Sequence, residues 1–152
     1  MLILMTLVRT LLVDDSPEFL GAAARFLATD PEIEIVGYAL SARKAIEEVT
    51  RLQPDLVLMD VAMPEMNGFV ATRQLKERPN PPRVIVLTLY DNDEYRAQAR
   101  AAGADGFVAM SETVDRLIPL VGDLLRRRAE ADRNEGSGIP TTRVKNLRVG
   151  GP

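Results

Sequence analysis

LVLMDVAMPEMNG, residues 56–68, is an apolar run that ends in one carboxylate and passes directly into a loop containing proline and glycine. Its four leading apolar residues predict a buried strand, with Asp60 at the strand tip. A second apolar run, residues 11–13, ends in the pair Asp14 and Asp15. The sequence therefore places three acids at the ends of two predicted strands.

Packing alone does not account for three carboxylates at strand ends, because burying each one costs on the order of several kcal/mol unless a cation offsets its charge. Mg²⁺ prefers carboxylate, carbonyl and water oxygens, so Asp14, Asp15 and Asp60 are its predicted ligands. The backbone carbonyl of Ala62 is a further predicted ligand. A carboxylate can attack phosphorus to form an acyl phosphate, and we expect Asp60 to be that nucleophile. Thr88, which ends a later apolar run, would offer its hydroxyl to a phosphoryl oxygen.

Short apolar runs alternate with amphipathic stretches five times along the chain. This alternation predicts an α/β fold, a doubly wound five-stranded parallel sheet of flavodoxin-like order 2-1-3-4-5 with helices on both faces. In such a sheet, ligands bind outside the carboxyl ends of the strands, where the three acids are expected. The predicted strands are Leu7–Val13, Ile33–Ala39, Leu56–Met59, Val84–Leu87 and Gly106–Ala109.

Helix signals fill the intervals between these strands. Ser16 and Ser41 are the predicted N-caps of the first two helices, and Gly103 is a predicted left-handed C-cap of the fourth. The fifth helix is predicted over residues 114–125. Pro119 lies inside it and predicts a kink or a local loosening.

Composition indicates an ordinary globular protein of 152 residues, with 46% hydrophobic and 27% charged residues. The absence of cysteine and histidine excludes disulfides, thiol catalysis, a histidine base and the usual zinc sites. No apolar run approaches the roughly 18 residues that a membrane-spanning helix needs, and the apolar start of the chain lacks the features of a signal peptide. We therefore expect no association with membranes.

Charge is unevenly distributed along the chain. Residues 1–125 carry 12 Lys/Arg and 19 Asp/Glu, a net charge of −7, whereas residues 126–152 carry 7 and 3, a net charge of +4. A compact acidic domain is a poor nucleic-acid binder, so we expect this chain itself to bind none. From residue 126 onward no periodic apolar face is present, and we expect fraying and disorder. The predicted division is a domain of residues 1–127 and a basic, disordered tail or truncated linker of residues 128–152.

Several fragments at matching spacing resemble the receiver domain of two-component response regulators. They are the pair Asp14-Asp15, Asp60 followed by Met63-Pro64 and Asn67-Gly68, Thr88 at a strand end, and the stretch Gly103–Phe107. The resemblance covers roughly Leu7–Arg127. Residues 87–95 are similar to receivers that precede a helix-turn-helix output domain in transcription factors.

This resemblance implies a role for each residue of the site. Asp60 would be the phosphoacceptor, with Asp14 and Asp15 as the magnesium-binding acids. Thr88 would be the switch hydroxyl, and Phe107 would be the aromatic side chain whose rotamer couples to it.

The resemblance also implies a cytoplasmic signalling module rather than a metabolic enzyme. The chain would receive its phosphoryl group from a sensor histidine kinase or a phosphotransfer protein. Output would pass through a homodimer or a protein partner at the face formed by the fourth helix, the fifth strand and the fifth helix.

One position departs from the family pattern. The family has a lysine at the end of the fifth strand, whose ammonium contacts the phosphoryl group, and this chain has Met110. Two unit charges about 4 Å apart interact by about 4 kcal/mol at an effective dielectric of 20, so this loss could weaken phosphorylation or its readout. Our expectation is a pocket that binds Mg²⁺ but makes a poorly switching acyl phosphate.

Three alternatives remain open. A pseudo-receiver would bind partners without being phosphorylated, which Met110 favours. A receiver fragment of a DNA-binding transcription regulator would have its output domain elsewhere, since residues 128–152 are too few and too irregular for a helix-turn-helix domain. A metal-dependent phosphohydrolase of another α/β family would need a second acid in an Asp-x-Asp arrangement, and Ala62 occupies that position.

Overall fold

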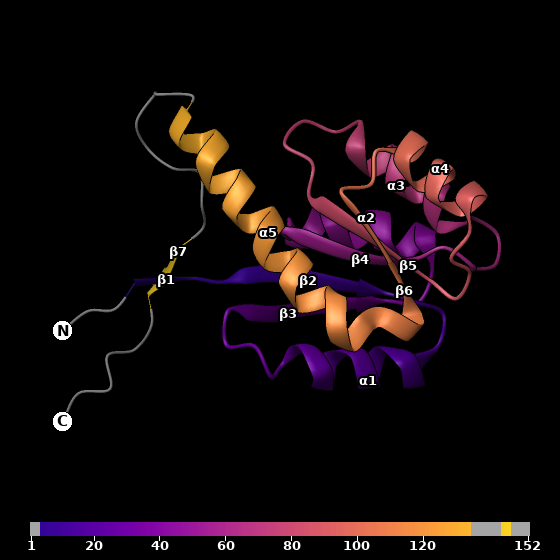
Figure 1. Ribbon diagram of the computed structural model, residues 1–152, viewed down its shortest axis with the longest axis horizontal. Coiled ribbons are helices and arrows are strands. Elements are labelled where there is room, and N and C mark those ends of the chain that lie inside the picture. The colour runs from indigo at the N-terminus through magenta and orange to yellow at the C-terminus, as the bar shows by residue number, and fades with distance from the viewer. Residues whose placement is uncertain (1–3, 135–143, 147–152) are drawn as a thin grey trace.

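The main sheet has five parallel strands in the order β3-β2-β4-β5-β6 (Figure 1). Because β2 is the first predicted strand and β6 the fifth, this arrangement confirms the predicted order 2-1-3-4-5. The computed structural model describes the backbone of residues 4–134 and 144–146 and the side chains of residues 7–124. The strands of the main sheet are β2 (Val8–Val13), β3 (Ile33–Ala39), β4 (Leu56–Asp60), β5 (Arg83–Thr88) and β6 (Gly106–Ala109).

Helices cover both faces of this sheet. Two helices lie on one face and three on the other, and their apolar side chains form separate core clusters with the strands between them (Figure 1). The first face carries α1 (Pro17–Leu27) and α5 (Thr113–Asn134); the second carries α2 (Ala42–Leu52), α3 (Gly68–Lys76) and α4 (Asp93–Ala102). A single 3-10 turn, η1 (Met110–Glu112), joins β6 to α5.

Side-chain alternation fixes the register of the central strands. Leu12 and Leu58 pack into the cluster under α1 and α5, whereas their neighbours Leu11 and Val57 pack into the cluster under α2 and α3. Each of these buried side chains stabilises the fold by roughly 1.5–3 kcal/mol. A slip of one residue would send every side chain to the opposite face, so the strand ends that carry the acids are fixed by the core.

The predicted helix caps are present. The Ser16 hydroxyl accepts a hydrogen bond from the Phe19 N–H at 3.2 Å, and the Ser41 hydroxyl accepts one from the Lys44 N–H at 3.1 Å. Gly103 ends α4 with a φ of 87°, a left-handed conformation that glycine adopts without strain. The local sequence therefore determined where these helices begin and end.

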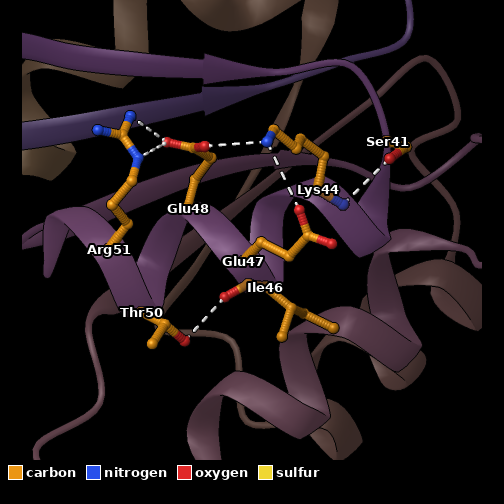
Figure 2. A network of polar contacts seen from close by, with 7 residues as sticks. All are labelled: Ser41, Lys44, Ile46, Glu47, Glu48, Thr50 and Arg51. Atoms are coloured by element: carbon orange, nitrogen blue, oxygen red, sulfur yellow. Dashed lines mark hydrogen bonds and ion pairs between the residues drawn. The ribbon is translucent and has the colours of Figure 1, made fainter.

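An ion-pair network explains a charged side chain in the buried face of α2. Glu48 is only 7% exposed, yet its carboxylate contacts Lys44 Nζ at 3.3 Å and Arg51 Nη2 at 2.6 Å (Figure 2). The hydrogen bond from Arg51 is the main cause that lowers the pKa of Glu48. Lys44 also reaches Glu47 at 3.5 Å, so the network lies along one side of the helix (Figure 2).

The C-terminal part differs in two respects from the predicted fraying and disorder, whereas the division into a domain and a tail stays a prediction. The fifth helix does not fray after residue 125 but continues through Asn134, because alanine, arginine and glutamate sustain a helix without a periodic apolar face. The predicted boundary after residue 127 therefore falls inside α5. Beyond it, β7 (Val144–Asn146) pairs antiparallel with β1 (Leu4–Thr6), a pairing of distant segments that local patterns do not reveal. The rest of the predicted tail lies outside the described residues.

Candidate functional site

Adjacent strand ends bring three acids together at the carboxyl edge of the sheet. Val13 in β2 lies opposite Met59 in β4, so the residues that follow them, Asp14 and Asp60, emerge side by side. One carboxylate oxygen from each of these two residues and from Asp15 lie within 4.8 Å of one another. The structure thus places the three predicted acids in one cluster.

Asp14 is held in a nearly buried position, with 4% of the residue exposed. Its Oδ1 accepts a hydrogen bond from the backbone N–H of Ser16 at 2.8 Å. Burial raises the pKa of Asp14 to about 6, and the charges of Asp60 and Asp15 add to this increase while the Ser16 N–H opposes it. The metal-free site therefore holds a proton on Asp14 more readily than an ordinary aspartate does.

Asp60 has a similar environment, with 6% of the residue exposed. Burial is the main cause that raises its pKa, and the charge of Asp15 acts in the same direction. The backbone N–H groups of Ala62 and Val61 oppose this effect, and the Ala62 N–H lies 3.3 Å from Asp60 Oδ1. These donors orient the Asp60 carboxylate at the edge of the sheet.

The acid cluster fits a hard divalent cation. No lysine or arginine in the described part of the chain forms an ion pair with Asp14, Asp15 or Asp60, and two of these carboxylates are buried. An uncompensated cluster of this kind favours a cation with oxygen ligands, and Mg²⁺ suits such a site. The three carboxylates are the groups that would hold the ion.

Gly68 allows the loop after β4 to close tightly against the acid strand. A Cβ atom at this position would overlap the carbonyl oxygen of Asp60 and would lie 2.8 Å from Val61 Cα. The Gly68 N–H donates to the Val61 carbonyl at 3.1 Å. Asn67 then caps α3 by accepting from the Val70 N–H at 3.0 Å, so the Asn-Gly pair joins the loop to the helix.

Thr88 ends β5, next to β4 in the sheet. Its side chain is buried, and its Oγ1 accepts a hydrogen bond from the Tyr90 N–H at 3.0 Å. The hydroxyl therefore has a partner in the loop that follows it. The hydroxyl in turn donates to the Tyr90 carbonyl at 3.4 Å, so a phosphoryl oxygen would have to replace that carbonyl as the acceptor of the Thr88 O–H.

Phe107 and Met110 lie outside the acid cluster. Phe107 is partly buried in β6 against the cluster formed with α3 and α4, and the guanidinium of Arg96 stacks on its ring. Met110 begins η1, one residue beyond the predicted strand end, and packs partly against the core under α1 and α5. The Arg96 contact was missed by the sequence analysis, because no local pattern relates a residue of α4 to one of β6.

A cleft of about 600 Å³ lies at the opposite edge of the sheet. Its lining includes prolines that precede β4 and β5, among them Pro54, Pro81 and Pro82, together with residues near the end of α2 and in the loop after α3. This edge carries the amino ends of the strands, where ligands of such sheets do not usually bind. The acid cluster remains the better candidate for the chemistry.

No helix in the described part of the chain combines the length and the apolar character required to cross a bilayer.

Known proteins share both the sequence pattern and the fold. A model of the response regulator receiver domain matches residues 10–121. Protein-glutamate methylesterase/protein-glutamine glutaminase 2 of Methanospirillum hungatei JF-1 is 38% identical over 117 residues, which are 77% of this chain and 32% of that protein. Transcriptional regulatory protein DegU of Brevibacillus brevis is 34% identical over 114 residues, which are 75% of this chain and 48% of that protein. The chain thus spans about a third to a half of these relatives.

Solved structures agree with this assignment. A LuxR-family two-component response regulator from Aurantimonas sp. SI85-9A1 has a TM-score of 0.76 and 27% identity, over 80% of this chain and 86% of that one. The signal receiver domain of the response regulator NarL from Mycobacterium tuberculosis has a TM-score of 0.75 and 28% identity, over 80% of this chain and 98% of that one. The family match, the sheet order and these likenesses together show that this chain belongs to the response regulator receiver family of two-component systems.

Proposed function

We propose that Asp60 accepts a phosphoryl group from a sensor histidine kinase or a phosphotransfer protein, with Asp14 and Asp15 holding Mg²⁺ beside it. The observation that carries this proposal is the cluster of three carboxylates, two of them buried, at the carboxyl edge of the sheet. Receiver domains generally bind Mg²⁺ in such an acidic pocket and interact with kinases or phosphotransfer proteins. The carbonyl of Ala62 would complete the protein ligands.

The chain's own groups would act in a simple sequence. A carboxylate oxygen of Asp60 attacks phosphorus, the bond from phosphorus to the donor histidine nitrogen breaks, and the electron pair of that bond stays on the imidazole. The backbone N–H groups of Val61 and Ala62 keep the Asp60 carboxylate oriented. The Thr88 hydroxyl leaves its Tyr90 partner and donates to a phosphoryl oxygen. Bound Mg²⁺ would neutralise the charge that gathers on the carboxylates and the phosphoryl oxygens.

The chain would act as a signalling module of the cytoplasm and not as a metabolic enzyme. Its relatives carry the receiver together with further sequence, and their names include a methylesterase and a transcriptional regulator. Output would require a partner or a second copy of the chain at the face formed by α4, β6 and α5. A DNA-binding output encoded on a longer chain is compatible with the same receiver chemistry.

Phosphodonor labelling tests the central claim. We expect radioactive acetyl phosphate with Mg²⁺ to label the wild-type chain, and Asp60→Asn to abolish the label. Asp30→Asn, which changes an aspartate between α1 and β3, is the matched control and should label normally. Label that persists in Asp60→Asn would assign the phosphoacceptor to another residue and contradict the proposal.

A pseudo-receiver is the second candidate, and Met110 is the observation that favours it. A site without the family's lysine has no ammonium to stabilise the phosphoryl group. Beryllofluoride, which mimics an acyl phosphate, separates the two functions when it is added with Mg²⁺. Shifts in the amide NMR signals around Asp60 and Thr88 support phosphorylation, whereas unchanged signals support a phosphorylation-independent binding module.

A further inference from the structure

An arginine lies against the aromatic ring on the face that α4 and β6 share. The guanidinium carbon of Arg96 is 5.1 Å from the centroid of the Phe107 ring. The same guanidinium donates to both carboxylate oxygens of Asp91, with Nε to Oδ1 at 2.6 Å and Nη2 to Oδ2 at 2.9 Å. A two-point bond of this kind fixes the plane of the guanidinium, which a single bond would leave free to rotate.

Asp91 lies in the short loop that begins at the predicted switch hydroxyl. Tyr90 donates its N–H to Thr88 Oγ1 at 3.0 Å, and the Tyr90 ring packs edge-on against Tyr95 in α4 with centroids 5.7 Å apart. The loop is thus bound to Thr88 at one end and to α4 at the other through Tyr95 and Arg96. A movement of Thr88 toward a phosphoryl group would pull on both contacts with α4.

Phe107 is enclosed from two directions. It packs against an apolar cluster that includes Val61, the residue after the phosphoacceptor candidate Asp60, and it meets Arg96 on another side. Apolar contacts with the cluster are not directional, whereas a fixed guanidinium favours the orientation in which it faces the ring. The ring is therefore held as long as Arg96 is held.

We propose that Arg96 is a positioning residue that keeps Phe107 in its present rotamer, and that Asp91 keeps Arg96 in place until the Thr88 loop moves. This inference rests on the proposed function, in which Thr88 and Phe107 form the switch, and it names the connection between them. The connection runs through the loop and α4, so it does not need a lysine at position 110. Substitution or displacement of Arg96 would leave the ring free to change rotamer without phosphorylation.

Fluorine NMR of the full chain tests the clamp directly. The chain contains four phenylalanines, so labelling with 4-fluorophenylalanine gives four signals, and Phe107→Leu identifies the one from Phe107. We expect Arg96→Gln to shift the Phe107 signal and to increase its sensitivity to exchange of H₂O for D₂O. Asp91→Asn should have the same effect although the arginine is still present. Arg96→Lys, which keeps the charge but not the two-point bond, should give an intermediate shift.

The matched control is Arg43→Gln, which removes the same charge from an exposed position of α2. It should leave the Phe107 signal unchanged, and the three other fluorine signals should stay in place in every variant if the fold is intact. Equal displacement of the Phe107 signal in Arg96→Gln and Arg43→Gln would overturn the clamp. An unchanged signal in Arg96→Gln would overturn it as well.

Beryllofluoride titration of the same samples with Mg²⁺ tests the link to the switch. Because the clamp favours the resting rotamer, its removal should make beryllofluoride bind roughly two- to five-fold more tightly in Arg96→Gln. Unchanged affinity would refute the link while leaving the proposed function intact. A wild-type chain that binds no beryllofluoride would instead refute the proposed function, and the link with it, while the fluorine signals without ligand still decide whether Arg96 clamps the ring.

Discussion

Asp14 shows how burial, with the neighbouring charges of Asp60 and Asp15, sets the chemistry of one side chain. Its pKa is about 6 in the fold against 3.8 for an ordinary aspartate, so the metal-free folded state binds a proton more tightly than the unfolded chain. The free energy of unfolding therefore falls as pH rises from about 4 to about 6 and stays lowered above that range. Asp14→Asn cannot ionise and should be more stable than wild type by about 1–2 kcal/mol at pH 7.5 in a chelator.

Urea denaturation at several pH values measures this effect. The advantage of Asp14→Asn should shrink toward zero as the pH approaches 4, because the wild-type carboxyl is then protonated in both states. Adding Mg²⁺ at pH 7.5 should stabilise wild type and have less effect on the variant, which has lost a predicted ligand. An advantage that is equal at pH 4 and pH 7.5 would show that packing, and not ionisation, separates the two proteins.

Gly68 gives a second prediction for a single residue. An added methyl group would meet the backbone of Asp60 and Val61, which cannot move without displacing the acid strand. We expect Gly68→Ala to lower the free energy of unfolding by about 1–3 kcal/mol and to weaken Mg²⁺ binding.

The matched control for that change is Gly21→Ala in the middle of α1. There the added methyl group meets only the end of the Arg25 side chain at 3.6 Å. It should stabilise the helix by about 0.5–1 kcal/mol. Thermal unfolding and Mg²⁺ titration measure the stability and the metal affinity of both variants. Similar stability and similar Mg²⁺ affinity in Gly68→Ala and Gly21→Ala would contradict a close approach at Gly68.

Among the elements, β6 depends on one acid for its attachment. β6 is an edge strand of the sheet. Asp105 immediately precedes it. The Asp105 carboxylate accepts hydrogen bonds from Lys76 Nζ at 2.8 Å, from Arg83 Nη1 at 3.1 Å and from the Val84 N–H at 2.8 Å. The Asp105 side chain is only 13% exposed. Asp105→Ala leaves these donors without their acceptor and should lower the free energy of unfolding by about 2–4 kcal/mol. Amide exchange in residues 106–109 should become faster.

An exposed pair provides the comparison for this prediction. Glu47 and Lys44 meet on the surface of α2 with both side chains more than half exposed. Glu47→Ala should therefore change the free energy of unfolding by less than about 1 kcal/mol. Equal losses in Asp105→Ala and Glu47→Ala, measured by denaturant titration, would argue against an anchoring role for Asp105.

The predictability of each element followed the range of the interactions that form it. Strand runs, the caps Ser16 and Ser41, and the glycine at the end of α4 depend on neighbours in sequence, and these predictions agree with the structure. The acid cluster was also predictable, because parallel strands bring their carboxyl ends to one edge. Two contacts join segments that are separated in the chain, the pairing of β1 with β7 and the stack of Arg96 on Phe107. No local sequence pattern predicts either of them.

At the scale of the whole molecule, the acid cluster and the α4–β6 face lie at different places on one sheet. β5 connects them, since Thr88 ends the strand beside Asp60 and opens the loop that leads to α4. In the proposed switch, a signal that starts at the carboxylates passes through the end of β5 on its way to Phe107. Met110, at the end of the neighbouring strand, is the position where the family adds a second connection through a lysine.

Met110→Lys tests how much that second connection contributes. A lysine at this position would bring an ammonium toward three carboxylates that have no cationic partner among the described residues. One interaction of this kind is worth up to about 4 kcal/mol, so we expect at least about tenfold faster labelling by acetyl phosphate and a larger response of the Phe107 signal. Met110→Leu keeps an apolar side chain against the core under α1 and α5 and should behave as wild type. If labelling became faster in both variants, the cause would be core packing. Equal labelling with an equal conformational response in all three proteins would mean that the absent ammonium does not limit this receiver.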